Sequence, residues 1–404
     1  MIVSQHPGQE AVVRRARVFA SDPKAETMAG KPHIVGSNEI RVGEPLPLDV
    51  YDAQGVLLLK EGYVIQSQRQ LDLLLERGAH FLTELFSKTE APSPSLHETR
   101  ELSPSERIDD IYFQLSFLKK HGTKADFNAR VLSVARRIQQ ACDTDPDGSL
   151  GAVLMDQREK YSIIHEVHCA LVCELVLRHM GRSAEDRLPL LAAGLTMNLD
   201  MLELQDKLFH QRGKLNEEQR REVRNHPYRS VEILQELGVR DDAWLTTVLQ
   251  HHELVDQSGY PQGLPGNEIS EEARILALAD IYCAKLYPRA YRAPLQPTAA
   301  AYDIFTGARG HGLDKDLSKL FIGELGIFHP GSFVRLRNGE LAVVARRGEK
   351  IHNPIVYSVV KANGELYIEP RRRDSSNPEF AVDKSIARGD VNIQINTSAI
   401  WRRT

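Results

Sequence analysis

Apolar residues recur every three or four positions through the middle of the chain, between residues 106 and 328. This spacing places them along one face of a helix, and turn-forming sequences separate one run from the next. We therefore predict an all-helical bundle with buried apolar faces. The two clearest runs are Ile108, Ile111, Tyr112, Leu115 and Leu118, followed by Phe127, Val131, Val134, Ala135 and Ile138.

The segment before the bundle has a different pattern. Two short apolar stretches, 47–52 and 56–59, flank an Asp-Ala-Gln-Gly turn and are expected to form strands. A helix should begin after Ser67 and end at Gly78, with residues 79–85 returning as a strand. Its inward-facing residues would be Leu71, Leu74 and Leu75. Residues 38–85 are therefore predicted to form a small α+β module.

The segment after the bundle alternates between apolar and polar residues with a period of two. Asn338-Gly339 and Asn363-Gly364 interrupt the alternation, and Asn-Gly pairs favour tight hairpin turns. We predict a small antiparallel β module of four to six strands over residues 330–397. The arginine run at 371–373 is expected to be a solvated charge cluster, with a phosphate contact as the less favoured alternative.

These patterns divide the chain into five parts. Residues 1–37 form a tail, 38–85 the α+β module, 86–105 a linker rich in Pro and Ser, 106–328 the helical domain, and 329–404 the C-terminal β module. The fold class is mainly α, with a small module at each end. The first module is either a regulatory or partner-binding unit or a packing appendage.

Composition narrows the functional classes. The chain has 404 residues, 42% of them apolar and 26% charged, with a net charge of −4. These values favour a cytoplasmic globular protein and give no reason to expect nucleic-acid binding. No apolar stretch reaches the ~18 residues that a membrane-spanning helix needs. Cys142, Cys169, Cys173 and Cys283 contain no Cys-x-x-Cys pair, and Cys169 and Cys173 are expected to pack in the core of a buried helix.

Candidate chemistry is concentrated in residues 249–264. His251, His252 and Glu253 end an apolar run and precede a turn built around Gly259-Tyr260-Pro261. Neutral imidazole is the commonest metal ligand in proteins, and two adjacent histidines reach one ion most easily where a helix ends. The residues therefore indicate a metal site, and a polar surface loop is the alternative reading of the same pattern.

The pattern HHE-x-x-D-x-S-G-Y-P-x-G-L in this stretch resembles the signature of the HD-GYP family, bacterial metal-dependent phosphodiesterases that open cyclic di-GMP. The resemblance extends over roughly 130 residues, since further parts of the family pattern match in order and spacing. It implies an HD-type helical bundle. It also implies the metal ligands His165, His226, His251, His252 and Asp280, and the substrate-binding residues Gly259, Tyr260, Pro261, Arg289 and Arg292.

One departure from the family pattern affects the mechanism. The resemblance places the family's His-Asp dyad 29 residues before His226, where this chain has Met197 and Asn198, and Met201 stands where the family has Lys. A neutral amide oxygen cannot hold two dications at close range, and a thioether is a poor ligand for hard or borderline ions. The site is therefore expected to be degenerate, with its catalytic residues unassigned. Asp200 is not expected to replace the lost carboxylate, because two residues along a helix it points to another face.

Three functional classes remain open. The favoured interpretation is a degenerate homologue with weak or no hydrolase activity, which binds cyclic di-GMP, a related nucleotide or a protein partner and regulates signalling. The alternatives are an active cyclic di-GMP phosphodiesterase with an unconventional metal site, and a structural module whose loop contacts a cyclase-type or other signalling protein. One divalent transition metal (Fe, Mn or Zn) or none is expected, since three histidines form an acceptable ligand set.

Overall fold

The computed structural model describes residues 102–401 apart from 157–158, 288–294, 307–311, 392, 394 and 396. Before residue 102 it describes only short pieces of the chain. These pieces are 31–34, 40, 42–43, 46, 50–51, 57–59, 63–65, 71, 74 and 80–83. The chain divides into two compact units at the boundary between Glu101 and Leu102.

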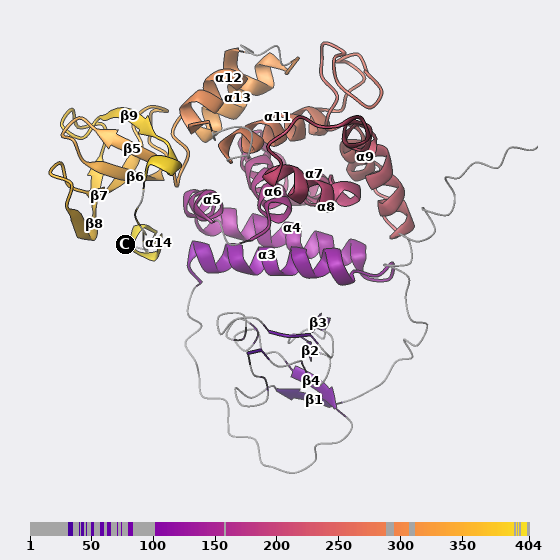
Figure 1. Cartoon of the computed structure of the whole chain (residues 1–404). Coiled ribbons are helices and arrows are strands. Elements are labelled where there is room, and N and C mark those ends of the chain that lie inside the picture. Colours follow the sequence, from indigo (N-terminus) through magenta and orange to yellow (C-terminus); the bar gives the residue numbers. More distant parts are fainter. Residues whose placement is uncertain are drawn as a thin grey trace, which may run out of the picture. The chain divides into compact units, whose positions relative to one another are not determined.

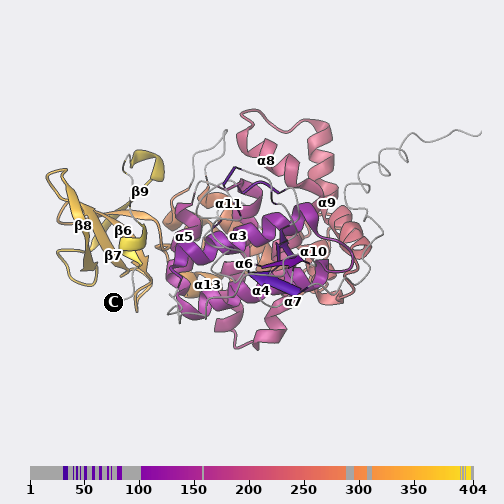
Figure 2. The ribbon, with the colours of Figure 1, turned by 90° about the horizontal axis from the view of Figure 1, so that it is seen from below.

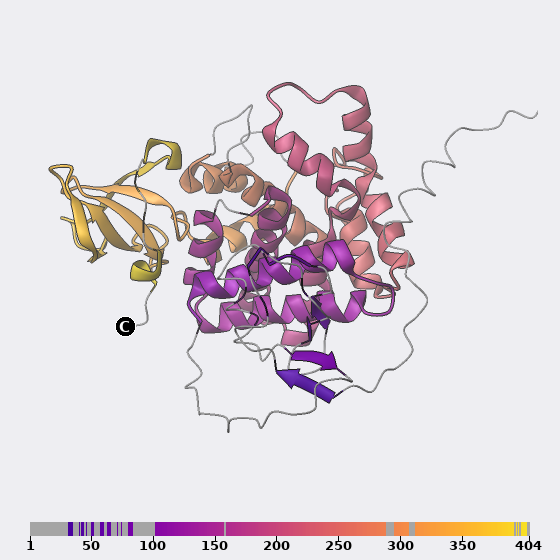
Figure 3. The ribbon, with the colours of Figure 1, turned by 60° about the horizontal axis from the view of Figure 1, so that its bottom comes forward.

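The first unit contains a four-stranded antiparallel sheet in the order β1-β4-β2-β3. Its strands are β1 (Lys31–Ile34), β2 (Val50–Tyr51), β3 (Leu57–Leu59) and β4 (His80–Thr83). The stretches predicted from sequence therefore contain β2, β3 and β4. Figure 3 shows β1 and β4 side by side as two arrows.

Strand β1 lies within the segment that the sequence analysis assigned to a tail, and that part of the assignment is wrong. The four residues of Lys31–Ile34 are too few for a recognisable alternation, and the partner strand β4 comes more than forty residues later. Leu71 and Leu74 are helical and buried, as predicted. Ser67 and Gly78, the expected ends of their helix, lie outside the described residues.

The second unit begins with a helical domain (Figure 1). Each helix is an amphipathic or fully apolar segment that buries its apolar face against its neighbours. The helices are α3 (Pro104–His121), α4 (Phe127–Thr144), α5 (Pro146–Met155), α6 (Tyr161–His179), α7 (Ala184–Thr196), the 3₁₀ helix Leu199–Met201, α8 (Leu202–His210), α9 (Glu217–Glu236), α10 (Asp242–Gln250), α11 (Glu271–Leu286), α12 (Pro297–Thr306) and α13 (Lys315–Leu325).

Helix α6 is the centre of this domain. Every residue from Tyr161 to Leu177 is buried, and the helix packs against α3, α4, α5, α7, α8, α11 and α13. Its residues are mainly apolar on every side, and a helix of this kind must be surrounded, which explains its position. His165 and Cys169 lie one turn apart near its beginning, so both reach the interior of the domain.

Side-chain caps set where the helices begin. Ser103 and Glu106 form a reciprocal capping box at the start of α3, and Asn216 and Gln219 form a second one at the start of α9. Helix α9 ends next to Leu237. No helix in the described part of the chain has both the length and the apolar character needed to cross a bilayer.

The C-terminal part is an antiparallel sheet of five strands in the order β8-β7-β6-β5-β9, which confirms the predicted β module. Its strands are β5 (Phe333–Leu336), β6 (Leu341–Arg346), β7 (Ile355–Val360), β8 (Leu366–Asp374) and β9 (Val382–Ile386), followed by a 3₁₀ turn (Arg388–Asp390) and α14 (Thr397–Ile400). Gly339 and Gly364 have φ values of 88° and 90°, which suit the predicted Asn-Gly turns.

The β module is attached to the helical domain next to α5, as Figure 2 shows from below. The indole of Trp401 packs against Gly151 of α5 and donates a hydrogen bond to the carbonyl of Ala345 at 3.0 Å. Arg346 forms an ion pair with Asp145 at 2.8 Å, and Arg347 bonds to Asp147. Apolar and charged contacts therefore act together at this junction.

Candidate metal centre

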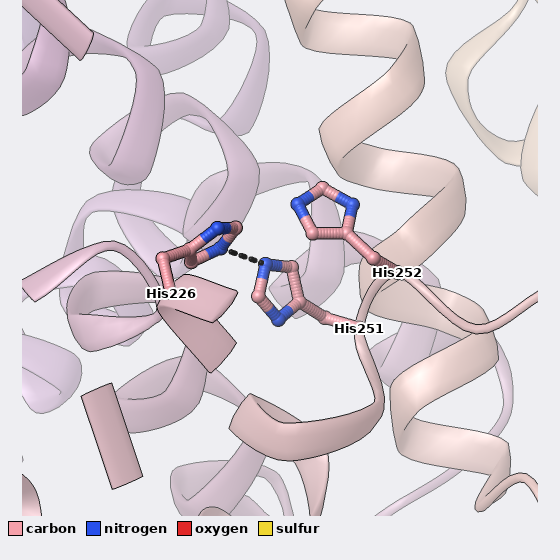
Figure 4. A group of neighbouring side chains, drawn as sticks. All are labelled: His226, His251 and His252. Atoms are coloured by element: carbon pink, nitrogen blue, oxygen red, sulfur yellow. Dashed lines mark hydrogen bonds between the residues drawn. The ribbon is translucent and has the colours of Figure 1, made fainter. Parts of the chain in front are cut away.

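Three histidines from two helices meet in the interior of the helical domain. His226 lies in the middle of α9, while His251 caps the end of α10 and His252 follows it. His226 and His251 are buried, and His252 is partly buried. Each contributes one ring nitrogen, and the three atoms lie within 4.8 Å of one another. Figure 4 shows the three rings next to one another.

The backbone fixes the tautomers of two of these rings. Nδ1 of His226 lies 2.7 Å from the carbonyl oxygen of Val223, and Nδ1 of His251 lies 2.7 Å from that of Val248. A carbonyl oxygen only accepts hydrogen bonds, so each Nδ1 carries the proton and donates it. The Nε2 atoms of both rings are therefore lone-pair donors, and they face each other at 3.2 Å.

Two lone pairs at this distance need a positive charge between them. A proton is a poor candidate, because burial, followed by the nearby His251, lowers the pKa of His226 to about 3. Burial likewise lowers the pKa values of His251 and His252. A divalent ion fits better, since neutral imidazole is its usual nitrogen ligand and the third ring adds a further donor.

A second group of donors lies beside the first. Nε2 of His165 on α6 lies 2.7 Å from Oδ1 of Asp280 on α11, and Sγ of Cys169 lies 3.7 Å from the same Nε2. The ligand atoms of these three residues also lie within 4.8 Å of one another. Nδ1 of His252 lies 3.8 Å from Oδ2 of Asp280, so the two groups are adjacent.

The electrostatics of the second group are set by Asp280 and its neighbours. Burial opposes ionisation of Asp280, but the hydrogen bond and charge of His165 outweigh it and hold the pKa of Asp280 well below its usual value. Burial lowers the pKa of His165, and the adjacent Cys169 and Asp280 reverse this effect and raise that pKa to about 10. Asp280 is therefore a carboxylate available to a cation.

The loop after His252 is held in shape by Glu253. Its buried carboxylate accepts hydrogen bonds from the backbone N–H groups of Gln262 at 2.6 Å, Gly263 at 3.2 Å and Leu264 at 3.0 Å. A side chain at Gly259 would overlap the backbone of residues 252–254, so the loop requires glycine there. These contacts give Glu253 and Gly259 a role in shaping the loop.

Tyr260 is the residue of this loop that faces the histidines. Its ring stacks on His252 with the centroids 4.5 Å apart and the planes 30° apart. The guanidinium of Arg224 on α9 lies 5.4 Å from the centroid of the same ring. Pro261 follows at a partly buried position and does not line the cavity beside the histidines.

A cavity of about 640 Å³ opens beside both donor groups. This volume is within the usual range for a small-molecule site. His165, His252 and Asp280 lie in its wall, and α8, α9 and the connection between them contribute basic and apolar side chains. The remaining lining residues are Tyr161, Asn198, Met201, Gln205, Leu208, Phe209, Gln211, Arg212, Gly213, Lys214, Leu215, Arg220, Val223, Tyr260 and Ala284.

Comparison with known proteins places this arrangement in a family. Residues 153–317 match the family described as HD domain. A cyclic di-GMP phosphodiesterase from Pseudomonas aeruginosa, PA4108, is 29% identical over 228 residues, which cover 55% of this chain and 54% of that protein. These matches support the HD-GYP family for the helical domain.

Two further relatives match shorter stretches of the HD-GYP domain. A 3'3'-cGAMP-specific phosphodiesterase 1 from Vibrio cholerae is 30% identical over 35% of this chain and 33% of its own length. The cyclic di-GMP phosphodiesterase response regulator RpfG from Xanthomonas campestris is 34% identical over 30% of this chain and 32% of its own length. The chain thus spans about half or less of the curated relatives it matches.

A solved structure also resembles the chain. Bd1817, described as an HDG"Y"P protein from Bdellovibrio bacteriovorus, aligns with a TM-score of 0.48 and 14% sequence identity. The alignment covers 71% of this chain and 97% of that protein.

The positions that depart from the HD-GYP pattern lie at different depths. Met197 ends α7 with its side chain fully buried in the main apolar core, whereas Asn198 and Met201 line the cavity. Asp200 is not among the lining residues. The nearby carboxylate of Asp206 accepts hydrogen bonds from the backbone and hydroxyl of Ser162. That Asp200 does not replace the lost carboxylate stays a prediction.

The structure brings His165, His226, His251, His252 and Asp280 together, while Arg289 and Arg292 lie outside the described residues. Sequence reasoning missed the thiol of Cys169 and the basic residues Arg212 and Arg220 in the cavity wall. Helix spacing gave no signal for Arg220, because it lies six positions before the predicted ligand His226 and so on another face of α9.

Proposed function

We propose that the HD-GYP domain binds a cyclic dinucleotide beside a divalent metal ion, hydrolyses it weakly or not at all, and serves as a nucleotide- or partner-binding regulator. The names of the relatives identify cyclic di-GMP and 3'3'-cGAMP as their substrates. Either ligand carries two phosphodiester groups and two purines. A site for such a ligand needs positive charge, an apolar surface and a volume of several hundred Å³.

The metal part of this proposal rests on the facing Nε2 atoms of His226 and His251. Two buried lone pairs at 3.2 Å are unfavourable alone and become favourable as donors to one ion. His226, His251 and His252 would hold that ion. When bound, it would act as a Lewis acid toward a phosphoryl oxygen.

The cavity wall supports the choice of a phosphodiester ligand. Arg212, Lys214 and Arg220 bring three cationic side chains to its α8–α9 side. Guanidinium groups recognise phosphate oxygens through paired hydrogen bonds, and lysine adds a point charge. Phe209 and Tyr161, which stack on each other with centroids 4.6 Å apart, offer aromatic surface to a purine.

The departures at Met197 and Asn198 support weak hydrolysis. The buried thioether of Met197 offers no donor to a hard or borderline ion, and the amide of Asn198 carries no charge. Phosphodiester cleavage develops negative charge on the phosphoryl oxygens, and two metal ions held by a bridging carboxylate match that charge best. A site without the bridge lacks stabilisation that is specific to the transition state, so we expect hydrolysis to weaken more than nucleotide binding.

Calorimetric titration of the full chain with cyclic di-GMP and 3'3'-cGAMP tests this proposal, together with metal analysis by mass spectrometry. The natural chain should bind at least one of the two nucleotides and contain a transition metal. His251→Ala should remove the ion of the three-histidine group and weaken binding. His210→Ala is the matched control, because His210 is exposed at the end of α8.

Two results would contradict the proposal. Absence of binding of both nucleotides by the metal-loaded chain would remove the nucleotide-binding role. Rapid turnover of either nucleotide by the unmodified chain would establish an active phosphodiesterase instead.

A further inference from the structure

The thiol of Cys169 is the third donor of the second group, beside His165 and Asp280. Cys169 is fully buried on α6, one turn after His165, and its Sγ lies 3.7 Å from Nε2 of that residue. Asp280, from α11, reaches the same point. Nitrogen, sulfur and oxygen donors from two helices therefore converge within 4.8 Å.

The other buried cysteines do not share this setting. Cys173 lies one further turn along α6 and Cys142 lies on α4, and neither belongs to a group of three metal-ligand side chains in the described part of the chain. Cys283 interacts with the Cys169 thiol from α11. Simple packing accounts for a buried thiol, but it gives no reason for the thiol to adjoin an imidazole and a carboxylate together.

We infer that His165, Cys169 and Asp280 hold a second divalent ion, and that the thiolate of Cys169 supplies a donor and a negative charge in the region where Met197 and Asn198 supply neither. The sequence analysis expected one ion at most, because Met197 and Asn198 stand in place of the family's His-Asp dyad. With Cys169 the group has three donors, the number found in zinc sites that leave a position for water or substrate.

The donor types define which ions this site takes. Thiolate sulfur is a soft ligand that favours Zn²⁺, Fe²⁺ or Co²⁺ over Mg²⁺ and Mn²⁺. Binding releases the thiol proton of Cys169 and the proton shared by His165 and Asp280, since each donor atom must present a lone pair. The three-histidine group has no thiol, so the two sites differ in a property that spectroscopy detects.

Loading of the metal-free full chain with Co²⁺ tests the inference without relying on activity. A cobalt–thiolate bond gives a charge-transfer absorption band in the near ultraviolet, which nitrogen and oxygen ligands do not give. The natural chain should bind two Co²⁺ ions and show this band. Cys169→Ser should lose the band and one of the two ions.

Two variants serve as controls. Cys173→Ser changes a buried thiol on the same helix and should keep both the band and the two ions. His251→Ala should keep the band and lose the other ion, which separates this inference from the proposed function. Circular dichroism of each variant establishes that it is folded.

A natural chain that binds Co²⁺ without the band would overturn the inference, and so would a band that survives in Cys169→Ser. In either case the three-histidine site and its nucleotide would stand unaffected. Loss of the ion in His251→Ala without loss of nucleotide binding would count against the proposed function alone.

Discussion

The indole of Trp401 packs so closely against Gly151 that the backbone of α5 has no room for a Cβ atom at that position. Trp401 is buried, and it belongs to the apolar cluster on one face of the C-terminal sheet. Trp401, which directly follows α14, thus joins the β module to the helical domain. A single methyl group at Gly151 is enough to disturb the contact.

The junction predicts opposite effects for two glycine substitutions. Gly151→Ala should lower the free energy of unfolding by about 1–3 kcal/mol, because the new methyl group displaces a packed indole. Gly323→Ala, in α13, should raise it by up to about 1 kcal/mol, because nothing lies within 4 Å of the added carbon and alanine favours the helix. Urea unfolding curves measure both values. Equal effects would show that the Trp401 contact does not stabilise the junction.

A second prediction concerns the loop that carries Tyr260. Glu253→Gln should lower the free energy of unfolding by about 1–3 kcal/mol, because a neutral amide accepts hydrogen bonds less strongly and brings N–H groups to a place where three backbone donors converge. Amide hydrogen exchange should accelerate at residues 262–264. Glu268→Gln, at an exposed position in the same loop, is the control. Unchanged exchange at 262–264 would contradict the role given to Glu253.

The pH dependence of stability provides a third prediction, in the β module. Burial opposes ionisation of Glu340, but hydrogen bonds from Arg373, Ser358 and Tyr367 outweigh it and lower the pKa of Glu340 to about 2. A carboxylate with a lower pKa in the folded state stabilises the fold above its unfolded pKa near 4.5. That stabilisation is lost as the pH falls from about 4.5 toward 2.

Thermal unfolding at a series of pH values tests this assignment. Glu340→Gln should be less stable than the natural chain at pH 7. The difference should shrink below about pH 4.5, because the unfolded natural chain then binds a proton at Glu340 that the folded chain does not bind. Glu349→Gln, at an exposed position, should follow the natural curve. A difference that stays constant from pH 7 to pH 3 would rule out the proposed role of the Glu340 carboxylate.

The same network shows what the sequence could reveal about the arginine run at 371–373. Two of the three arginines are exposed, as expected for a solvated cluster, while Arg373 bonds to Glu340 at 3.0 Å. Alternation along β8 places Arg373 on the same strand face as Arg371, so periodicity alone cannot distinguish them. The distinction depends on Glu340, which lies thirty-three residues earlier on the chain.

The helical domain and its histidines could be predicted because their signals are local. Apolar spacing marks the buried faces of α3 and α4, and capping residues mark where α3 and α9 begin. The thiol of Cys169 could not be assigned in the same way. Its partner Asp280 comes from α11, more than a hundred residues later, and helix spacing carries no information about which helix packs opposite.

Glu166 also has a partner on a distant helix that its local sequence does not reveal. Its place beside His165 suggests an exposed polar residue or a simple core position, yet it is fully buried in an ion pair with Lys119 of α3. Burial lowers the pKa of Lys119 well below its usual value. Only the packing of α3 against α6 brings the two side chains together, so no local pattern predicts the pair.

The last prediction concerns catalysis at the departures from the family pattern. Asn198 and Met201 already lie in the wall of the cavity with His165, His252 and Asp280. Met197→His, Asn198→Asp and Met201→Lys together would place an imidazole, a carboxylate and an ammonium in this region. Hydrolysis of cyclic di-GMP should be absent or weak in the natural chain and rise on the order of a hundredfold in the triple variant.

Chromatographic measurement of the linear dinucleotide product tests this gain, with two further variants as controls. His252→Ala or Asp280→Ala, added to the triple variant, should abolish the new activity, because each removes a donor beside the restored carboxylate.

The buried position of Met197 makes its substitution the most demanding, since an imidazole there needs a hydrogen-bond partner in a core that has packed around a thioether. The double variant Asn198→Asp with Met201→Lys therefore tests whether the carboxylate and the ammonium restore activity without the buried imidazole. Robust turnover by the natural chain, lost in both His252→Ala and Asp280→Ala, would show that Met197 and Asn198 never disabled the site.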